Sequence, residues 1–359
     1  PTLSTTTTPQ SILTMPYNDF AEFIGGKGKA KMVWEQLRLY GMDPLHEDSK
    51  LSAKVKQHLS ELLKVRYIIT TTTTASDNTT KLLIKLQDNQ LIETVIIPSY
   101  RLDHSTLCIS TQIGCDRRCS FCATGTMGLL RNLTPVEILI QIILAQHNYH
   151  TTIPKITNIV FMGMGDAGGN IKSVTTAVHT LIDTQKFQFS PNKICVSTVG
   201  PKPETFTELL SLPVQTAWSL HSVNDSVRKL LVPSTKYTTI EMRDSIIMNM
   251  TKKPYKKRVL LVAFTLISGI NDSLQDAKDL YEFLLPLHSI CSKVIINLIP
   301  YNNIYTTSSN STSFERPADD RIVAMMQYLR ERGLFCSVRS TRGESEAAAC
   351  GMLVTQRQR

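Results

Sequence analysis

The sequence predicts an α/β protein whose main part is a parallel sheet built from repeated strand–helix units. From about residue 106 onward, short apolar runs alternate at least six times with segments of helix length. Continuous apolar runs are typical of strands that are buried on both faces, as in parallel sheets with helical crossovers. We therefore expect an open or closed barrel whose functional site lies at the carboxyl ends of the strands.

The part of the chain before this alternation predicts a small accessory domain. Residues 16–65 are expected to be helical because apolar residues recur there at three- and four-residue spacing. Runs with β character follow at residues 67–74, 80–86 and 91–98. The domains predicted from this pattern are a disordered tail over 1–15, a helical and β accessory domain over 16–105, a barrel over 106–345, and a C-terminal loop and tail over 346–359.

Polar residues gather where the expected barrel strands end. These strands cover residues 106–111, 156–163, 193–198, 215–221, 258–267, 293–300 and 334–340. The helices between them are expected at residues 135–146, 171–184, 203–212, 240–250, 274–285 and 319–332. The polar positions are the segment Gly163 to Asp166, then Ser197, Ser219, His221 and Asn297. Because the carboxyl ends of parallel strands meet at one edge, these side chains are predicted to share a site.

Net charge favours a nucleic-acid partner, and the apolar runs are too short to predict a transmembrane helix. The net charge is +9, from 39 Lys and Arg against 30 Asp and Glu, which favours binding to a polyanion. No apolar run approaches the ~18 residues of a transmembrane helix. The chain begins with Pro1 and a Thr-rich segment. Cytoplasm is the expected location, with plastid or mitochondrion as alternatives, and a monomer is the expected state.

Three of the eight cysteines lie within the eight residues CDRRCSFC, at Cys115, Cys119 and Cys122. A structural zinc site would need a fourth protein ligand, and His104 lies on the far side of a strand. Buried, unliganded thiols are a further alternative, although the loop is otherwise polar. A [4Fe–4S] cluster held by three thiolates leaves one iron open to a chelating small molecule. The spacing therefore favours such a cluster.

CxxxCxxC in a loop after the first strand of a β/α repeat resembles the motif of the radical S-adenosylmethionine (SAM) superfamily. Its flanks, STLCISTQIGCDRRCSFCATGTMGLLRNLTPVEI, resemble the RlmN/Cfr family almost residue for residue. ETVIIP, VSTVG, SLHSVNDSVRKLLVP, INLIPYN and TRGESEAAACG extend the resemblance over about residues 90–352. It implies a radical SAM partial (β/α)6-type barrel, a [4Fe–4S] cluster, and methylation of adenosine C2 in large-subunit rRNA, with tRNA as a further substrate.

The resemblance also implies roles for individual residues. Cys350 accepts a methyl group from one SAM, and a second SAM supplies a 5′-deoxyadenosyl radical that activates this methyl group. Cys108 resolves the adduct through a transient disulfide with Cys350, and Glu93 accepts a proton. Without the resemblance, Cys108 would be interpreted as an ordinary core thiol. The positions that contact SAM are Gly165, Asp166, Ser197, Ser219, Leu220, His221 and Asn297.

One motif departs from the family pattern. The usual GMGEP is replaced by GMGDAGGN, so that the carboxylate of Asp166 is one methylene shorter and Ala167 stands in place of the proline. The two glycines that follow are expected to add flexibility, and the departure predicts weaker SAM binding or a shifted loop. A Cfr-like C8 methyltransferase and a degenerate RNA-binding paralogue are the alternative functions.

Two partners follow from the same resemblance and from charge. The electron is expected from a flavodoxin- or ferredoxin-like donor. The basic run Lys252 to Arg258, with Arg117, Arg118 and Arg131, is expected to form an RNA-binding rim around the barrel mouth.

Overall fold

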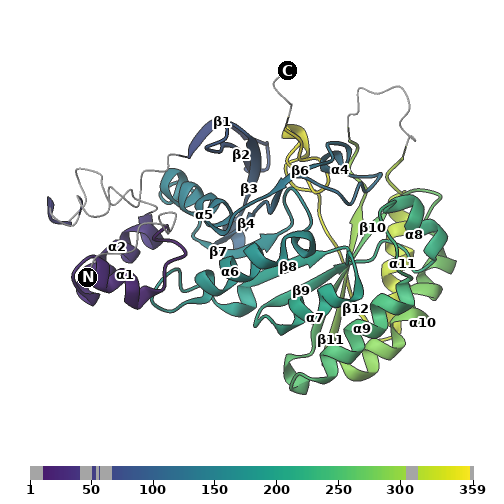
Figure 1. Cartoon of the computed structure of the whole chain (residues 1–359). Coiled ribbons are helices and arrows are strands. Elements are labelled where there is room, and N and C mark those ends of the chain that lie inside the picture. Colours follow the sequence, from purple (N-terminus) through teal and green to yellow (C-terminus); the bar gives the residue numbers. More distant parts are fainter. Residues whose placement is uncertain (1–10, 41–50, 54–55, 57–66, 305–313, 356–359) are drawn as a thin grey trace.

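Strands from most of the described chain join into one ten-stranded sheet, and helices pack along it (Figure 1). The structure, a computed structural model, describes residues 11–40, 51–53, 56, 67–304 and 314–355. The first ten residues of the predicted tail lie outside these ranges, as do residues 41–50, 54–55 and 57–65 of the region expected to be helical. Residues 11–15, expected within the tail, instead form a turn that buries Ile12 and Leu13 in the core.

The sheet combines an antiparallel accessory part with a parallel barrel part. In spatial order its strands are β1 Ile68–Thr74, β2 Thr80–Lys85, β3 Leu91–Ser99, β4 His104–Cys108, β7 Ile156–Phe161, β8 Ile194–Thr198, β9 Gln215–Ser219, β10 Val259–Leu266, β11 Lys293–Pro300 and β12 Phe335–Val338. The strands from β1 to β4 pair antiparallel, and those from β4 to β12 pair parallel. β1 and β12 form the two edges, so the barrel is open in the described part of the chain.

The pairing of β3 with β4 sets Val95 opposite Cys108 and joins the predicted accessory region to the barrel in one sheet. The division of the chain near residue 105 stays a prediction.

Helices connect the parallel strands as the alternation predicts. The described α-helices are α1 Tyr17–Phe23, α2 Lys27–Tyr40, α4 Ala123–Thr126, α5 Pro135–Tyr149, α6 Ile171–Ile182, α7 Pro203–Ser211, α8 Asp225–Leu231, α9 Thr239–Thr251, α10 Leu274–Ile290 and α11 Asp319–Glu331. Thr134, Thr238 and Ser273 begin α5, α9 and α10 with capping boxes, in which side chains satisfy the free backbone amides of the first turn. None of the described helices is long and apolar enough to cross a membrane.

A small hairpin brackets the cysteine loop. β5 Gln112–Gly114 pairs antiparallel with β6 Leu129–Asn132, and the three cysteines lie between them. Gly114 has a φ of +73°, and a Cβ there would overlap the carbonyl oxygen of Gly128. This glycine lets the two ends of the loop approach closely. The strands of three and four residues are too short for the sequence pattern to predict them.

The segment after β7 forms a packed turn. Residues Ala167–Asn170 make one 3-10 turn in which Ala167 is buried. Asn170 donates through Nδ2 to the carbonyls of Thr111 and Leu133, both at 2.8 Å. A Cβ on Gly168 would overlap Oγ1 of Thr198 and lie 2.6 Å from Cγ2 of Thr205. The glycine therefore permits close contact with the end of β8.

We predict that Gly168→Ala lowers the free energy of unfolding by about 1–3 kcal/mol, because the new methyl group overpacks this contact. Gly169→Ala is the matched control, since its Cβ would lie 3.0 Å from Nε2 of Gln112 and 3.9 Å from Oδ1 of Asp116, without overlapping either. Urea unfolding of both variants measures the difference. Equal stabilities would contradict the packed turn.

Candidate active site

A cavity with an open volume of about 890 Å³ lies at the carboxyl ends of the parallel strands. The thiols of Cys115, Cys119 and Cys122 line one part of it. The predicted strand-end residues that also line it are Gly165, Asp166, Ser197, Ser219 and His221. The structure thus brings the cysteine loop and most of the predicted SAM-contacting residues to one place, where the strand-end rule puts them.

Two predicted contacts do not line this cavity. Leu220 is fully buried, and its amide donates to the carbonyl of Ala263. Asn297 lies within β11 and accepts a hydrogen bond from the hydroxyl of Ser337 at 2.8 Å. Ile299, two residues further along the same face of β11, does line the cavity.

The three thiols of the loop are free and are exposed little or only in part. Burial raises the pKa of all three, so each favours its protonated form until a metal replaces the proton. No three His, Cys, Asp or Glu side chains among the described residues are grouped closely enough to hold a metal ion. Three separate thiols around one cavity suit a centre with several metal atoms, each taking one thiolate.

Asp166 is held against the end of β8. Its carboxylate accepts hydrogen bonds from the hydroxyl of Thr198 at 3.0 Å and the amide of Val199 at 3.2 Å. Its own amide donates to Oε1 of Gln112 at 2.8 Å. Burial raises the pKa of Asp166 to about 6, and the Thr198 hydrogen bond opposes that rise. The carboxylate is thus held in place in the cavity wall.

His221 contributes a neutral ring to the same wall. Its Nδ1 accepts from the amide of Thr265 at 3.1 Å, which leaves Nε2 as the donor. Burial lowers the pKa of His221 to about 3, so the ring is uncharged near neutral pH. Its backbone φ is +63°, and Phe121 of the cysteine loop packs edge-on at 4.7 Å. Ser197 and Ser219 are joined through their hydroxyls at 3.1 Å.

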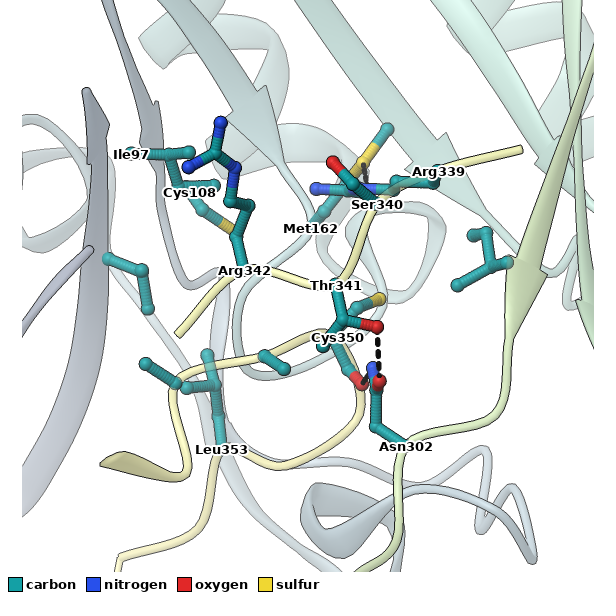
Figure 2. A pocket seen from close by; sticks show the side chains of 14 residues that line it. Ile97, Cys108, Met162, Asn302, Arg339, Ser340, Thr341, Arg342, Cys350 and Leu353 are labelled. Atoms are coloured by element: carbon teal, nitrogen blue, oxygen red, sulfur yellow. Dashed lines mark hydrogen bonds between the residues drawn. The ribbon is translucent and has the colours of Figure 1, made fainter. Parts of the chain in front are cut away.

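A second cavity, with an open volume of about 510 Å³, adjoins the first (Figure 2). Cys108 of β4 and Cys350 of the C-terminal loop both line it, and Cys350 also lines the first cavity. Cys108 is buried, which raises the pKa of its thiol to about 12, whereas Cys350 is exposed. Nδ2 of Asn302 donates to the Cys350 carbonyl at 3.0 Å. Cys350 therefore stands where the two cavities meet.

Glu93 contacts the C-terminal loop and lines neither cavity. Its carboxylate pairs with Nζ of Lys81 at 3.1 Å and accepts from the amide of Val354 at 2.8 Å. Lys81 also donates to the carbonyl of Ala347 at 3.3 Å. The observed contacts therefore fasten the loop that carries Cys350. The predicted role of Glu93 as proton acceptor stays a prediction.

Residues that the sequence reasoning missed complete the second cavity. Met162, Asn302 and Arg339 line it, and the Arg339 guanidinium lies 3.9 Å from the Met162 sulfur (Figure 2). Met162 and Arg339 directly follow β7 and β12, and Asn302 lies two residues after β11. The strand-end rule was therefore the signal that could have found them.

The predicted basic rim is wrong in part. The run from Lys252 to Arg258 immediately precedes β10, so it lies at the amino end of the sheet, away from the cavities. Arg258 itself donates to the carbonyls of Lys253, Thr251 and Ile290. Arg131 is paired with Asp88 and Glu137.

Of the two arginines of the cysteine loop, Arg117 lines the first cavity and Arg118 does not. The guanidinium of Arg117 is paired with Asp116.

Comparison with known proteins finds close relatives, although no protein-family model matches the chain. The dual-specificity RNA methyltransferase RlmN of Magnetococcus marinus is 37% identical, over 90% of this chain and 88% of the relative. RlmN of Marinomonas sp. is 33% identical, over 94% and 90%. The crystal structure of a radical SAM methyltransferase from Sphaerobacter thermophilus matches 96% of this chain and 99% of its own, with a TM-score of 0.84 and 30% identity. The chain belongs to the RlmN family of radical SAM methyltransferases.

Proposed function

We propose that the protein methylates C2 of an adenosine in large-subunit rRNA, and also in tRNA, through a methyl group carried on Cys350. The observation that carries the proposal is that Cys350 borders two cavities, with the cysteine loop on one and Cys108 on the other. A methyl group attached to Cys350 can thus be activated from the first cavity and transferred to a base at the second.

The first cavity suits a [4Fe–4S] cluster with bound SAM. Cys115, Cys119 and Cys122 would hold the cluster, which with SAM supplies a one-electron cleavage that yields an adenosyl radical. Asp166 accepts the ammonium of the methionine part of SAM, and the strand-end hydroxyls suit its ribose and carboxylate. The electron comes from a flavodoxin- or ferredoxin-like protein.

The target base is expected beside Cys350, on the side of the second cavity. Adenine C2 is an electron-poor aromatic carbon that does not attack a methyl sulfonium, so direct transfer from SAM fails. Cys350, exposed on its loop, accepts the methyl group first and presents its carbon to the base. An unstacked adenine has to enter from the open side. Cys108, buried across the cavity, then attacks the Cys350 sulfur and forms a disulfide. The bond between that sulfur and the transferred carbon breaks, its electron pair passes to the carbon, and uptake of a proton there gives the methyl group of the released product.

We predict that anaerobically reconstituted protein, given SAM, a reductant and a large-subunit rRNA fragment, produces 2-methyladenosine in the digested RNA. Cys350→Ala abolishes the product because the methyl carrier is lost. Cys108→Ala traps the RNA on the protein, visible as a slow band on a denaturing gel. Cys195→Ala is the matched control, because Cys195 is a buried thiol of β8 that lines neither cavity. Mass spectrometry of the nucleosides measures the outcome.

Other products would change the assignment. An 8-methyladenosine peak would move the reaction to C8 of the ring. Absence of any methylated adenosine on rRNA and tRNA, from protein with a full complement of iron, would refute the proposed reaction.

We predict that Asp166→Asn raises the Kd for SAM about tenfold or more, because a charge-assisted hydrogen bond to the ammonium is lost. The variant keeps an oxygen for the Val199 amide and an NH₂ for the Thr198 hydroxyl, so the loop is preserved. Asp183→Asn, just after α6, is the control and leaves the Kd unchanged. Anaerobic equilibrium dialysis measures both, and undiminished binding by Asp166→Asn would place the ammonium elsewhere.

A further inference from the structure

Arg228 is a buried cation behind the strand ends of the first cavity. It lies on α8 and is only 1% exposed. One NH₂ group donates to the carbonyl of Leu220 at 2.9 Å and the other to the carbonyl of Val199 at 2.6 Å. Its guanidinium also lies over the Trp218 ring at 5.9 Å. The side chain therefore ties together the turns that follow β8 and β9.

The charge of Arg228 has no carboxylate partner among the described residues. Its contacts are two neutral carbonyls and a ring, and its Nε has no hydrogen-bond acceptor in the part of the chain that the structure describes. The nearest acid in sequence, Asp225, instead accepts from the amide of Thr239. A buried, unpaired charge is strongly unfavourable, so a negative group is expected close by.

The helix that carries Arg228 packs directly on the cysteine loop. The amide of Ser120 donates to the carbonyl of Leu231 at 3.0 Å, and its hydroxyl donates to that of Leu230 at 3.1 Å. Phe121 shares an apolar cluster with Leu231, and Cys119 and Cys122 pack against that cluster. The guanidinium thus lies within electrostatic reach of the thiols.

The burial of this cation has the expected electrostatic effect. Desolvation lowers the pKa of Arg228 to about 10, because the charged form is disfavoured away from water. A negative group close to the guanidinium would offset that cost.

We propose that Arg228 is the counter-charge of the cysteine-bound iron–sulfur cluster and raises its reduction potential. The inference rests on the proposed function, in which the three cysteines hold that cluster. Three thiolates outweigh the positive charge of an oxidised [4Fe–4S] core, and reduction adds one further electron from a low-potential donor. A fixed cation in a site of low dielectric stabilises the more negative, reduced form, and local charge is one determinant of cluster potentials.

A purely structural role for Arg228 is the alternative, and Arg258 provides the matched control. Arg258 also donates to several backbone carbonyls, but it directly precedes β10 and so lies at the amino ends of the strands, opposite the cysteines. Its loss removes comparable hydrogen bonds without changing the charge near the cysteines.

The test is an anaerobic redox titration of the full-length reconstituted protein, followed by the electron paramagnetic resonance signal of the reduced cluster. We expect Arg228→Gln to lower the reduction equilibrium constant about tenfold, which is about 59 mV for one electron. Arg228→Lys keeps the charge and stays near the wild-type potential, and Arg258→Gln leaves the potential unchanged.

The outcomes separate the two proposals. Wild-type protein that binds no iron or sulfide would refute the proposed function, and this inference with it. A cluster with the same potential in wild type and Arg228→Gln would overturn the inference alone. If Arg228→Gln loses the cluster and Arg228→Lys retains it, the need for a counter-charge is supported. If both lose it while Arg258→Gln retains it, Arg228 acts through its hydrogen bonds and the inference fails.

Discussion

The site depends on the return of the C-terminal loop across the open side of the barrel. The parallel sheet ends at β12 and does not close on β4, so strands alone leave one side of the interior open. The loop bridges that side: Thr124 donates to the Leu353 carbonyl at 2.6 Å, and Ala123 donates to that of Gly351 at 2.7 Å. The chain that carries Cys350 is thereby fastened to the helix that follows the cysteine loop.

The same loop is also fastened to both ends of the sheet. On the accessory side, Asp77 accepts from the Gly343 amide at 3.1 Å. Lys81 donates to the Ala347 carbonyl, and Glu93 accepts from the Val354 amide. On the barrel side, Asn302 holds the Cys350 backbone. Cys350 is thus exposed at its thiol but held at its backbone. Such an arrangement suits a group that has to meet two different partners in fixed positions.

The alternation of apolar runs and helical segments was sufficient to predict the parallel strands. Buried strands give continuous apolar runs, and amphipathic helices give apolar residues at three- and four-residue spacing. α8 and the β5–β6 hairpin were missed, since elements of three to seven residues carry too little periodicity. The contact of Glu93 with the C-terminal loop could not be predicted either, because its partner Val354 comes from a distant segment of the chain.

The error over the basic run has a different cause. The run directly precedes a strand, which places it at the amino ends of the parallel strands. Net charge alone does not distinguish the two ends of a sheet. Cys108 and Cys350 were identified through family resemblance. Their meeting across one cavity depends on the curvature of the whole sheet, which no local pattern records.

Asp166 and Gly168 are linked through Thr198 at the end of β8. The Thr198 hydroxyl donates to the Asp166 carboxylate at 3.0 Å, and a Cβ on Gly168 would overlap the same hydroxyl oxygen. A glycine at this position therefore lets the turn approach β8 closely enough for the short Asp166 side chain to be hydrogen-bonded there. The carboxylate is buried at the cavity wall with both of its oxygens accepting hydrogen bonds, which offsets the cost of burying it.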